Sequence, residues 1–145
     1  MKRLKRIARR ITAFDETIEQ FIKECEDSGR FDSSQMSEIR EGFEDGLTIE
    51  QVKVYANPEF DWKQMFEIHL GFENGLSMEE VELFTDPEFD YRQMFEIRYG
   101  LQNGLSIEQV KLYADPNFVD DYMEAIRYDL KNGMSIEEVE EKYDL

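Results

Sequence analysis

The sequence predicts an all-α protein: an α-solenoid-like stack of helix-turn-helix repeats of about 29 residues, preceded by a long N-terminal capping helix. Two observations predict this fold. A glycine-led phrase recurs at a spacing of 29 residues, beginning at Gly46, Gly75, Gly104 and Gly133. Each phrase also carries a helix-capping pattern, followed by apolar residues at helical spacing. Repeat proteins offer an extended surface rather than a pocket, which favours binding over catalysis.

The first helix of each repeat is predicted by its capping residues. A hydroxyl residue stands three positions before a glutamine or glutamate, which is the spacing of a capping box. The pairs are Thr48 and Gln51, Ser77 and Glu80, Ser106 and Gln109, and Ser135 and Glu138. Proline disfavours helical geometry in the residue before it. These helices must therefore end before Pro58, Pro87 and Pro116.

The second helix of each repeat is predicted to begin just after Phe60 or Phe89. The capping pairs there are Asp61 with Gln64 and Asp90 with Gln93, and Asp32 with Gln35 in an earlier, incomplete unit. The buried stripe comprises Met65, Ile68 and Phe72 in one copy and Met94, Ile97 and Leu101 in the next. The helix ends where Gly75 or Gly104 supplies a left-handed C-cap.

The chain divides into an amphipathic N-terminal helix, residues 1–29, and a helical repeat domain, residues 30–145. The units lie near 30–45, 46–74, 75–103 and 104–132, with a terminal half-unit at 133–145. In the last full unit Val119, Tyr122 and Glu124 replace the usual Asp, Gln and Phe. The N-terminal apolar stripe comprises Leu4, Ile7, Ile11, Phe14, Ile18, Phe21 and Cys25. We favour a capping helix, and a dimeric coiled coil is the alternative.

The composition is that of a folded domain, because 41% of the 145 residues are hydrophobic and 13% are aromatic. No apolar run approaches the ~20 residues that span a bilayer, and no secretory signal is present. The single cysteine, Cys25, cannot form an internal disulfide. These features predict a cytoplasmic protein.

Charge is distributed unevenly along the chain. The net charge is −17, and six of the 17 basic side chains lie in residues 1–12, which contain no acid. The rest of the chain therefore carries a net charge of −23. Such an acidic body repels nucleic acid and anionic membranes and attracts basic protein surfaces.

The segment from Tyr55 to Ile68, continuing to Gly71 and Gly75-Leu76, resembles a known type of short repeat. Its pattern is YA-[DN]-P-x-F-x-x-x-QM-x-EIR-x-G-x-x-x-GL. Repeats of this type occur in phage, plasmid and conjugative-element proteins of gut Firmicutes, including antirestriction-like polyproteins. The resemblance covers residues 31–145 and implies a mobile-element setting in a bacterial host cell. It supplies no catalytic residues.

A basic position recurs directly after a buried isoleucine in each unit, at Arg40, His69, Arg98 and Arg127. One interpretation is a row of cations that faces an anionic partner. We favour the other, in which each cation pairs with carboxylates of its own or the next unit. His69 occupies an arginine position, and one histidine without a cysteine partner does not indicate a metal site. No catalytic motif, cofactor site or metal site is expected.

Recurring acids and aromatics are the candidate partner-binding residues. The set comprises Glu50, Glu67, Glu79, Glu80, Glu82, Glu96, Glu108, Trp62 and Tyr91. The carboxylates either mimic regularly spaced nucleic-acid phosphates or form solvated faces. Trp62 and Tyr91 either anchor an interface or pack partly against the preceding loop.

The N-terminal basic cluster is a further candidate contact patch, formed by Lys2, Arg3, Lys5, Arg6, Arg9 and Arg10. It either grips nucleic acid or acts as a solubilising cap that pairs with nearby acids.

Together these features predict a non-enzymatic protein-binding module. Its expected role is a phage or mobile-element inhibitor, of anti-CRISPR or antirestriction type, of a host nucleic-acid-processing defence enzyme. Its partner is a protein with a basic surface. The alternative is a structural or adaptor repeat protein that organises a larger assembly or forms a homodimer through its N-terminal helix.

Overall fold

The computed structural model describes residues 17–145, and the regular structure within them is entirely helical. The all-α prediction is therefore confirmed for this part of the chain. After a helical segment at residues 17–28, the helices are α2 (Ser33–Glu44), α3 (Ile49–Tyr55), α4 (Trp62–Glu73), α5 (Met78–Glu82), α6 (Tyr91–Gln102), α7 (Ile107–Lys111), α8 (Asp120–Lys131) and α9 (Ile136–Tyr143). The N-terminal basic cluster and residues Leu4 to Phe14 of the apolar stripe lie outside the described residues.

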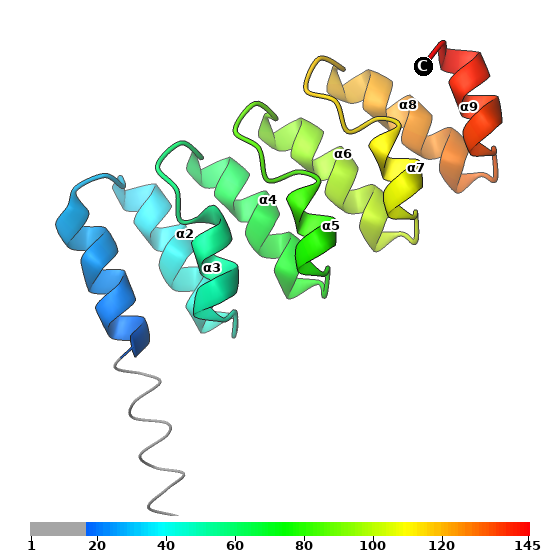
Figure 1. Ribbon diagram of the computed structural model, residues 1–145. Helices are drawn as coiled ribbons and strands as arrows, with labels where there is room; N and C mark the ends of the chain where they lie inside the picture. The colour runs from blue at the N-terminus through cyan, green and yellow to red at the C-terminus, as the bar shows by residue number, and fades with distance from the viewer. Residues whose placement is uncertain (1–16) are drawn as a thin grey trace, which may run out of the picture.

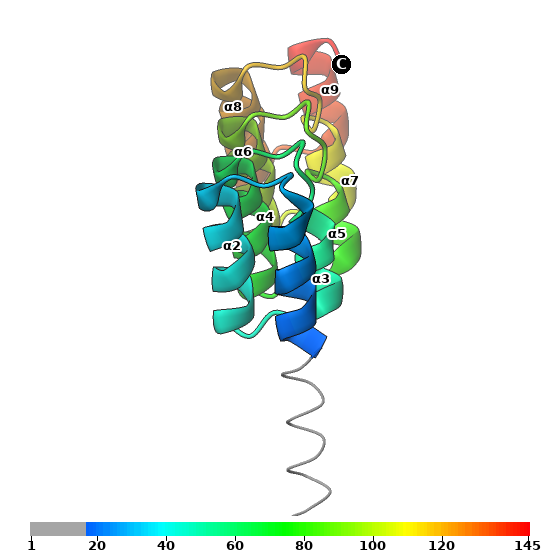
Figure 2. The ribbon, with the colours of Figure 1, turned by 90° about the vertical axis from the view of Figure 1, so that its left-hand side faces the viewer.

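The helices form two rows. The long helices α2, α4, α6 and α8 have 12 residues each, begin 29 residues apart and pack side by side in sequence order. The short helices α3, α5, α7 and α9 form the second row, and segment 17–28 lies beside α3 at the N-terminal end of that row (Figures 1 and 2). We call these the long-helix row and the short-helix row.

The capping signals position the helices as the sequence predicts. The helices from α2 to α7 each begin with a complete capping box, and Ser135 accepts a hydrogen bond from the backbone N–H of Glu138 at the start of α9. Only α8 among these helices lacks a side-chain cap, because Val119 stands at its N-cap. These bonds satisfy the free backbone donors at the helix ends.

The core lies between the two rows. The predicted stripe residues Met65, Ile68, Met94 and Ile97 are fully buried. Tyr55, Phe84 and Tyr113 are also fully buried, at equivalent positions near the ends of the short helices. The hydroxyls of Tyr55 and Tyr113 donate to the backbone carbonyls of Glu38 and Glu96, at 3.3 and 3.0 Å. Burial raises the pKa of both phenols above the ordinary value, which keeps them protonated as donors.

The described part of the N-terminal helix packs on the first long helix. Phe21, Ile22 and Cys25 contact the core, and the Phe21 ring meets the edge of Phe43 at a centroid distance of 5.8 Å. Arg40 on α2 also pairs with Glu26 of this segment. These contacts hold residues 17–28 against α2, and the choice between a capping helix and a dimeric coiled coil stays a prediction. In the part of the chain that the structure describes, no helix is both long enough and apolar enough to cross a membrane.

Candidate functional site: the outward face of the long-helix row

A glutamine in each of three long helices links it to the following interhelical loop. The Nε2 atoms of Gln35, Gln64 and Gln93 donate to the carbonyl oxygens of Phe60, Phe89 and Phe118, at 2.7, 2.6 and 2.6 Å. Each also contacts the proline carbonyl two residues earlier, at 2.9 to 3.3 Å. In α8 the equivalent residue is Tyr122, whose hydroxyl donates instead to the carbonyl of Tyr143, the last residue of α9 (Ile136–Tyr143), at 3.1 Å. These bonds fix the spacing at which each helix presents its outward side chains.

Buried ion pairs join neighbouring long helices. The Nε atoms of Arg98 and Arg127 lie 2.6 Å from Oε2 of Glu67 and Glu96, respectively. Each glutamate is on the long helix that precedes its arginine's helix. His69 occupies the same position between α2 and α4, facing Glu38. Burial raises the pKa of Glu67 and Glu96 above the ordinary value, against the opposing effect of their arginine partners.

These pairs correct two expectations from the sequence. Glu67 and Glu96 were candidate contacts, but both are buried against arginines and present no free carboxylate to a partner. The arginines do pair with carboxylates, as the favoured interpretation held, but with those of the preceding long helix rather than of their own or the next unit. The partners of each pair are 31 residues apart and meet only where two helices pack, so no short sequence pattern predicts which carboxylate an arginine binds.

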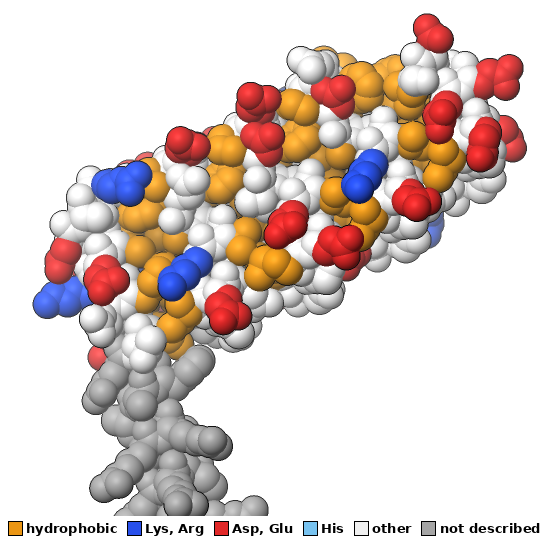
Figure 3. All heavy atoms as spheres, viewed as in Figure 1, with side chains coloured by type: hydrophobic (Ala, Val, Ile, Leu, Met, Phe, Trp, Pro, Cys, Tyr) orange, Lys and Arg blue, Asp and Glu red, His pale blue; other side chains and the backbone are white. Residues whose placement is uncertain are grey.

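The other candidate carboxylates lie in the short-helix row. Glu50, Glu79, Glu82 and Glu108 are exposed there, whereas Glu80 is half-buried and accepts the N–H of Ser77 within its capping box. Lys53 in α3 and Lys111 in α7 occupy the position that Glu82 holds in α5. Figure 3 shows this row with acidic side chains interspersed with basic and hydrophobic ones. Its charge is therefore mixed along its length.

Trp62 and Tyr91 occupy the same position in the first turn of α4 and α6. The Trp62 side chain is exposed, at 44% of its maximum, whereas Tyr91 is half-buried. The Nζ of Lys63 lies 5.7 Å from the Trp62 ring centre and 4.9 Å from that of Tyr91. The lysine thus bridges the two rings by cation–π contact.

Four more aromatic side chains, which the sequence reasoning missed, extend this surface. Phe66 and Phe95 lie one turn after Trp62 and Tyr91, and Tyr99 and Tyr128 lie at equivalent positions of α6 and α8. All four are exposed, Tyr128 to 66%. We call these four residues, together with Trp62 and Tyr91, the aromatic face. A signal existed for Phe66 and Phe95, which lie four residues after the two predicted aromatics, and for Tyr99, which lies four residues after Phe95.

Cations and rings interlock within the aromatic face. The Phe95 and Tyr99 rings stack at a centroid distance of 5.3 Å. The guanidinium carbons of Arg98 and Arg127 lie 5.3 and 4.7 Å from the ring centres of Phe95 and Tyr99. The ion pairs thus hold arginines where they support the exposed rings, which limits the conformational entropy that binding would cost.

The aromatic face is centred on α4 and α6, and Tyr128 is its one ring on α8. The position of Phe66 and Phe95 is Ser37 in α2 and Glu124 in α8. The buried methionine and isoleucine positions, in contrast, are the same in all four long helices. The fold therefore needs the buried residues but does not need the exposed rings. Exposed acids flank the face at both ends, namely Glu41 and Glu44 on α2 and Asp121 and Glu124 on α8.

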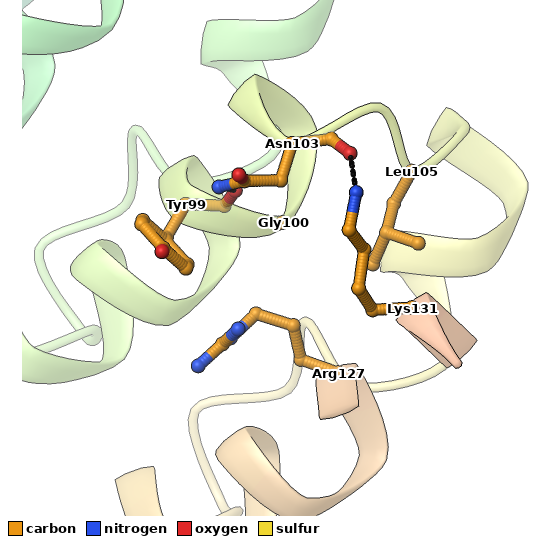
Figure 4. A pocket seen from close by; sticks show the side chains of 6 residues that line it. All are labelled: Tyr99, Gly100, Asn103, Leu105, Arg127 and Lys131. Atoms are coloured by element: carbon orange, nitrogen blue, oxygen red, sulfur yellow. Dashed lines mark hydrogen bonds between the residues drawn. The ribbon is translucent and has the colours of Figure 1, made fainter. Parts of the chain in front are cut away.

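A shallow hollow between α6 and α8 continues the aromatic face. It measures about 120 Å³ and is lined by Tyr99, Gly100, Asn103, Leu105, Arg127 and Lys131. Lys131 Nζ reaches across it to the Asn103 carbonyl oxygen, at 2.7 Å (Figure 4). Small-molecule sites are several times larger, so this hollow fits a single side chain of a partner rather than a ligand.

Comparison with known proteins finds no match of this chain to a protein-family model, to a curated protein or to a solved structure.

Proposed function

We propose that this chain is a non-enzymatic, α-solenoid-like repeat module that binds a protein through its aromatic face. The partner class we propose is a host nucleic-acid-processing defence enzyme, which the module inhibits on behalf of a phage or mobile element. The observation that carries the proposal is the group of exposed rings on α4 and α6, whose shared phenylalanine position is Ser37 in α2 and Glu124 in α8.

The chemistry of the aromatic face favours a protein partner. Exposed aromatic rings supply large contact areas and are enriched among the residues that dominate binding energy. Several exposed rings gathered on neighbouring helices of a strongly acidic protein favour an interaction site there, because a surface that meets only water has no need of them. Trp62, Tyr99 and Tyr128 are the most accessible rings on the three helices that carry the face.

The charge of the molecule favours a basic partner. The chain carries −17 overall, and Glu41, Glu44, Asp121 and Glu124 lie at the two ends of the aromatic face. A partner with an apolar centre and basic flanks complements this arrangement, and long-range attraction would accelerate its association. Enzymes that hold nucleic acid in a basic groove present such flanks.

The test is an inhibition assay on purified enzymes. The full chain is titrated into cleavage reactions of a panel of restriction endonucleases and RNA-guided nucleases. We expect inhibition of at least one enzyme. The affinity should fall at least about tenfold between roughly 50 and 200 mM salt, because several charge contacts across the interface would be screened. The double variant Phe66→Ser/Phe95→Ser copies the serine of α2, so it removes the rings without disturbing the core.

The control variant is Glu79→Gln/Glu108→Gln in the short-helix row. It also changes two exposed side chains, but away from the aromatic face. We expect it to inhibit as the unmodified chain does, while the double serine variant loses inhibition by tenfold or more. Full inhibition by the serine variant would show that the aromatic face is not the binding surface. Loss of inhibition in the glutamine variant alone would favour phosphate mimicry by the short-helix row instead.

A further inference from the structure

One joint between consecutive long helices differs chemically from the next two. At each joint the later helix contributes a cation that pairs with a glutamate of the earlier helix: His69 with Glu38, Arg98 with Glu67, and Arg127 with Glu96. Only the joint between α2 and α4 uses an imidazole, which is 1% exposed. An imidazole offers a lone pair, whereas a guanidinium does not.

Two flanking positions differ at the same joint. The residue that caps the earlier helix is Asp45 there, and it is Asn74 and Asn103 at the next two joints. The residue four positions after the cation is Glu73 there, and it is Gln102 and Lys131 at the next two joints. Three positions of the unit thus change together, each to a residue type that coordinates metal ions.

These three side chains converge. Nε2 of His69 lies 2.8 Å from Oδ2 of Asp45 and 3.7 Å from Oε2 of Glu73, and the three donor atoms all lie within 4.8 Å of one another. Two ligands of a tetrahedral zinc ion lie about 3.4 Å apart, given metal–ligand distances of about 2.0–2.1 Å. Side-chain movements of less than about 1 Å would therefore place all three around one ion.

The surroundings of His69 supply the remaining features of a metal site. Oε2 of Glu38 lies 3.4 Å from Nδ1, on the opposite side of the ring from Asp45 and Glu73. A carboxylate there accepts a hydrogen bond from Nδ1–H, which fixes the tautomer that leaves the Nε2 lone pair free for the metal. The Asp45 and Glu73 side chains are 43% exposed, so the site opens to solvent and leaves room for a water ligand.

The charge balance also favours a divalent cation. Glu38, Asp45 and Glu73 place three carboxylates around one imidazole, whereas Arg98 and Arg127 each bring a permanent positive charge to their joints. A proton on the ring neutralises one of the three negative charges. A divalent ion neutralises two, and the nitrogen ligand selects zinc over magnesium or calcium.

We propose that Asp45, His69 and Glu73 bind a divalent transition-metal ion, that Zn²⁺ is the ion this donor set fits, and that Glu38 orients the imidazole. The ion would link the end of α2 to the middle and end of α4. It would thereby stiffen the joint next to Phe66, whose ring packs edge-on to the His69 ring at a centroid distance of 6.4 Å.

The test is calorimetric titration of Zn²⁺ into the metal-free full chain, in a Cys25→Ala background that removes the thiol as a competing ligand. We expect saturable binding of one ion per chain, no displacement by excess Mg²⁺, and a rise in Tm with zinc. Co²⁺ in place of Zn²⁺ should give a visible spectrum typical of nitrogen and oxygen ligands.

Three matched variants copy residues of the following unit: His69→Arg, Asp45→Asn and Glu73→Gln. Because each copies a residue that a neighbouring joint already accommodates, the fold should survive, which circular dichroism checks. We expect each to weaken zinc binding at least tenfold and to abolish the zinc-dependent rise in Tm. Glu79→Gln, an exposed acid on α5, should bind as the parent chain does.

The proposal is overturned if the parent chain shows no saturable binding. It is also overturned if His69→Arg binds zinc with unchanged affinity and stoichiometry, because exposed acids alone would then hold the ion. Neither outcome bears on the proposed inhibitor function, which is tested by variants of the aromatic face.

Discussion

The side-chain amide of Gln64 donates a 2.6 Å hydrogen bond to the carbonyl oxygen of Phe89, 25 residues ahead in the chain. The same side chain accepts the backbone N–H of Asp61 through its Oε1, at 2.9 Å, and so completes the capping box of α4. One residue therefore both begins its own helix and anchors the loop of the following pair. Gln35 and Gln93 repeat this dual role.

Replacing Gln64 by methionine should destabilise the fold by roughly 2–4 kcal/mol, because it leaves a buried carbonyl unpaired and removes a cap. Chemical denaturation measures this loss. Gln51→Met is the matched control, since Gln51 serves only a capping box. It should cost about 1 kcal/mol. Equal losses for the two variants would show that the bond to the Phe89 carbonyl contributes nothing.

Gly100→Ala should destabilise the protein, because an added Cβ would lie 2.0 Å from the buried hydroxyl oxygen of Tyr113. Overpacking of this kind costs roughly 1–3 kcal/mol. In Gly71→Ala the nearest atom to the added Cβ would be a ring carbon of Phe84, at 2.9 Å, so we expect a smaller loss. Adding Tyr113→Phe should restore part of the stability lost in Gly100→Ala. Thermal unfolding of the three variants checks this order, and an additive double variant would contradict it.

Glu67→Leu should destabilise the fold by roughly 3–5 kcal/mol, because it leaves the Arg98 guanidinium buried without a counter-charge. The double variant Glu67→Leu/Arg98→Met removes both charges at once. We expect it to recover most of that loss, since a well-packed apolar pair often replaces a buried ion pair at little cost. Denaturation midpoints of both variants provide the measurement. A double variant less stable than the single one would show that the pair itself is strongly stabilising.

Val119→Asp should stabilise the protein by about 1 kcal/mol, because it gives α8 the side-chain cap that it lacks. Asp32, Asp61 and Asp90 fill this role at the equivalent positions. The valine is 66% exposed, so little apolar burial is lost. Val119→Ala, which adds no cap, should leave Tm nearly unchanged. A lower Tm in the aspartate variant would show that repulsion from Asp120 and Asp121 outweighs the cap.

Helix starts were predictable from the chain because a capping box is complete within four residues. Asp61 with Gln64 and Ser106 with Gln109 form the boxes that their spacing predicted. Buried positions such as Met65 and Ile97 were also predictable, because the spacing of apolar residues along one helix indicates its buried side. The extents of α5 and α7 were less predictable, because each ends several residues before the proline that bounds it.

The candidate site was predicted only in part. Trp62 is exposed and Tyr91 is half-buried, and their role as interface anchors stays a prediction. The exposed rings of Phe66, Phe95, Tyr99 and Tyr128 were missed. A 29-residue period assigns these residues to equivalent positions but does not say which side of a helix faces solvent. That side is determined where α4 packs against α2 and α6.

Local capping and helical periodicity were sufficient to predict the all-helical structure of residues 17–145 and the beginnings of the helices, because these signals act over a few residues. Which charged residues are buried in ion pairs and which are exposed depended on contacts between helices that are distant in sequence. Glu67 and Glu96 resemble solvated acids in the chain, yet each is buried against an arginine 31 residues away. Asp45, His69 and Glu73 likewise become a single cluster only when α2 and α4 pack side by side.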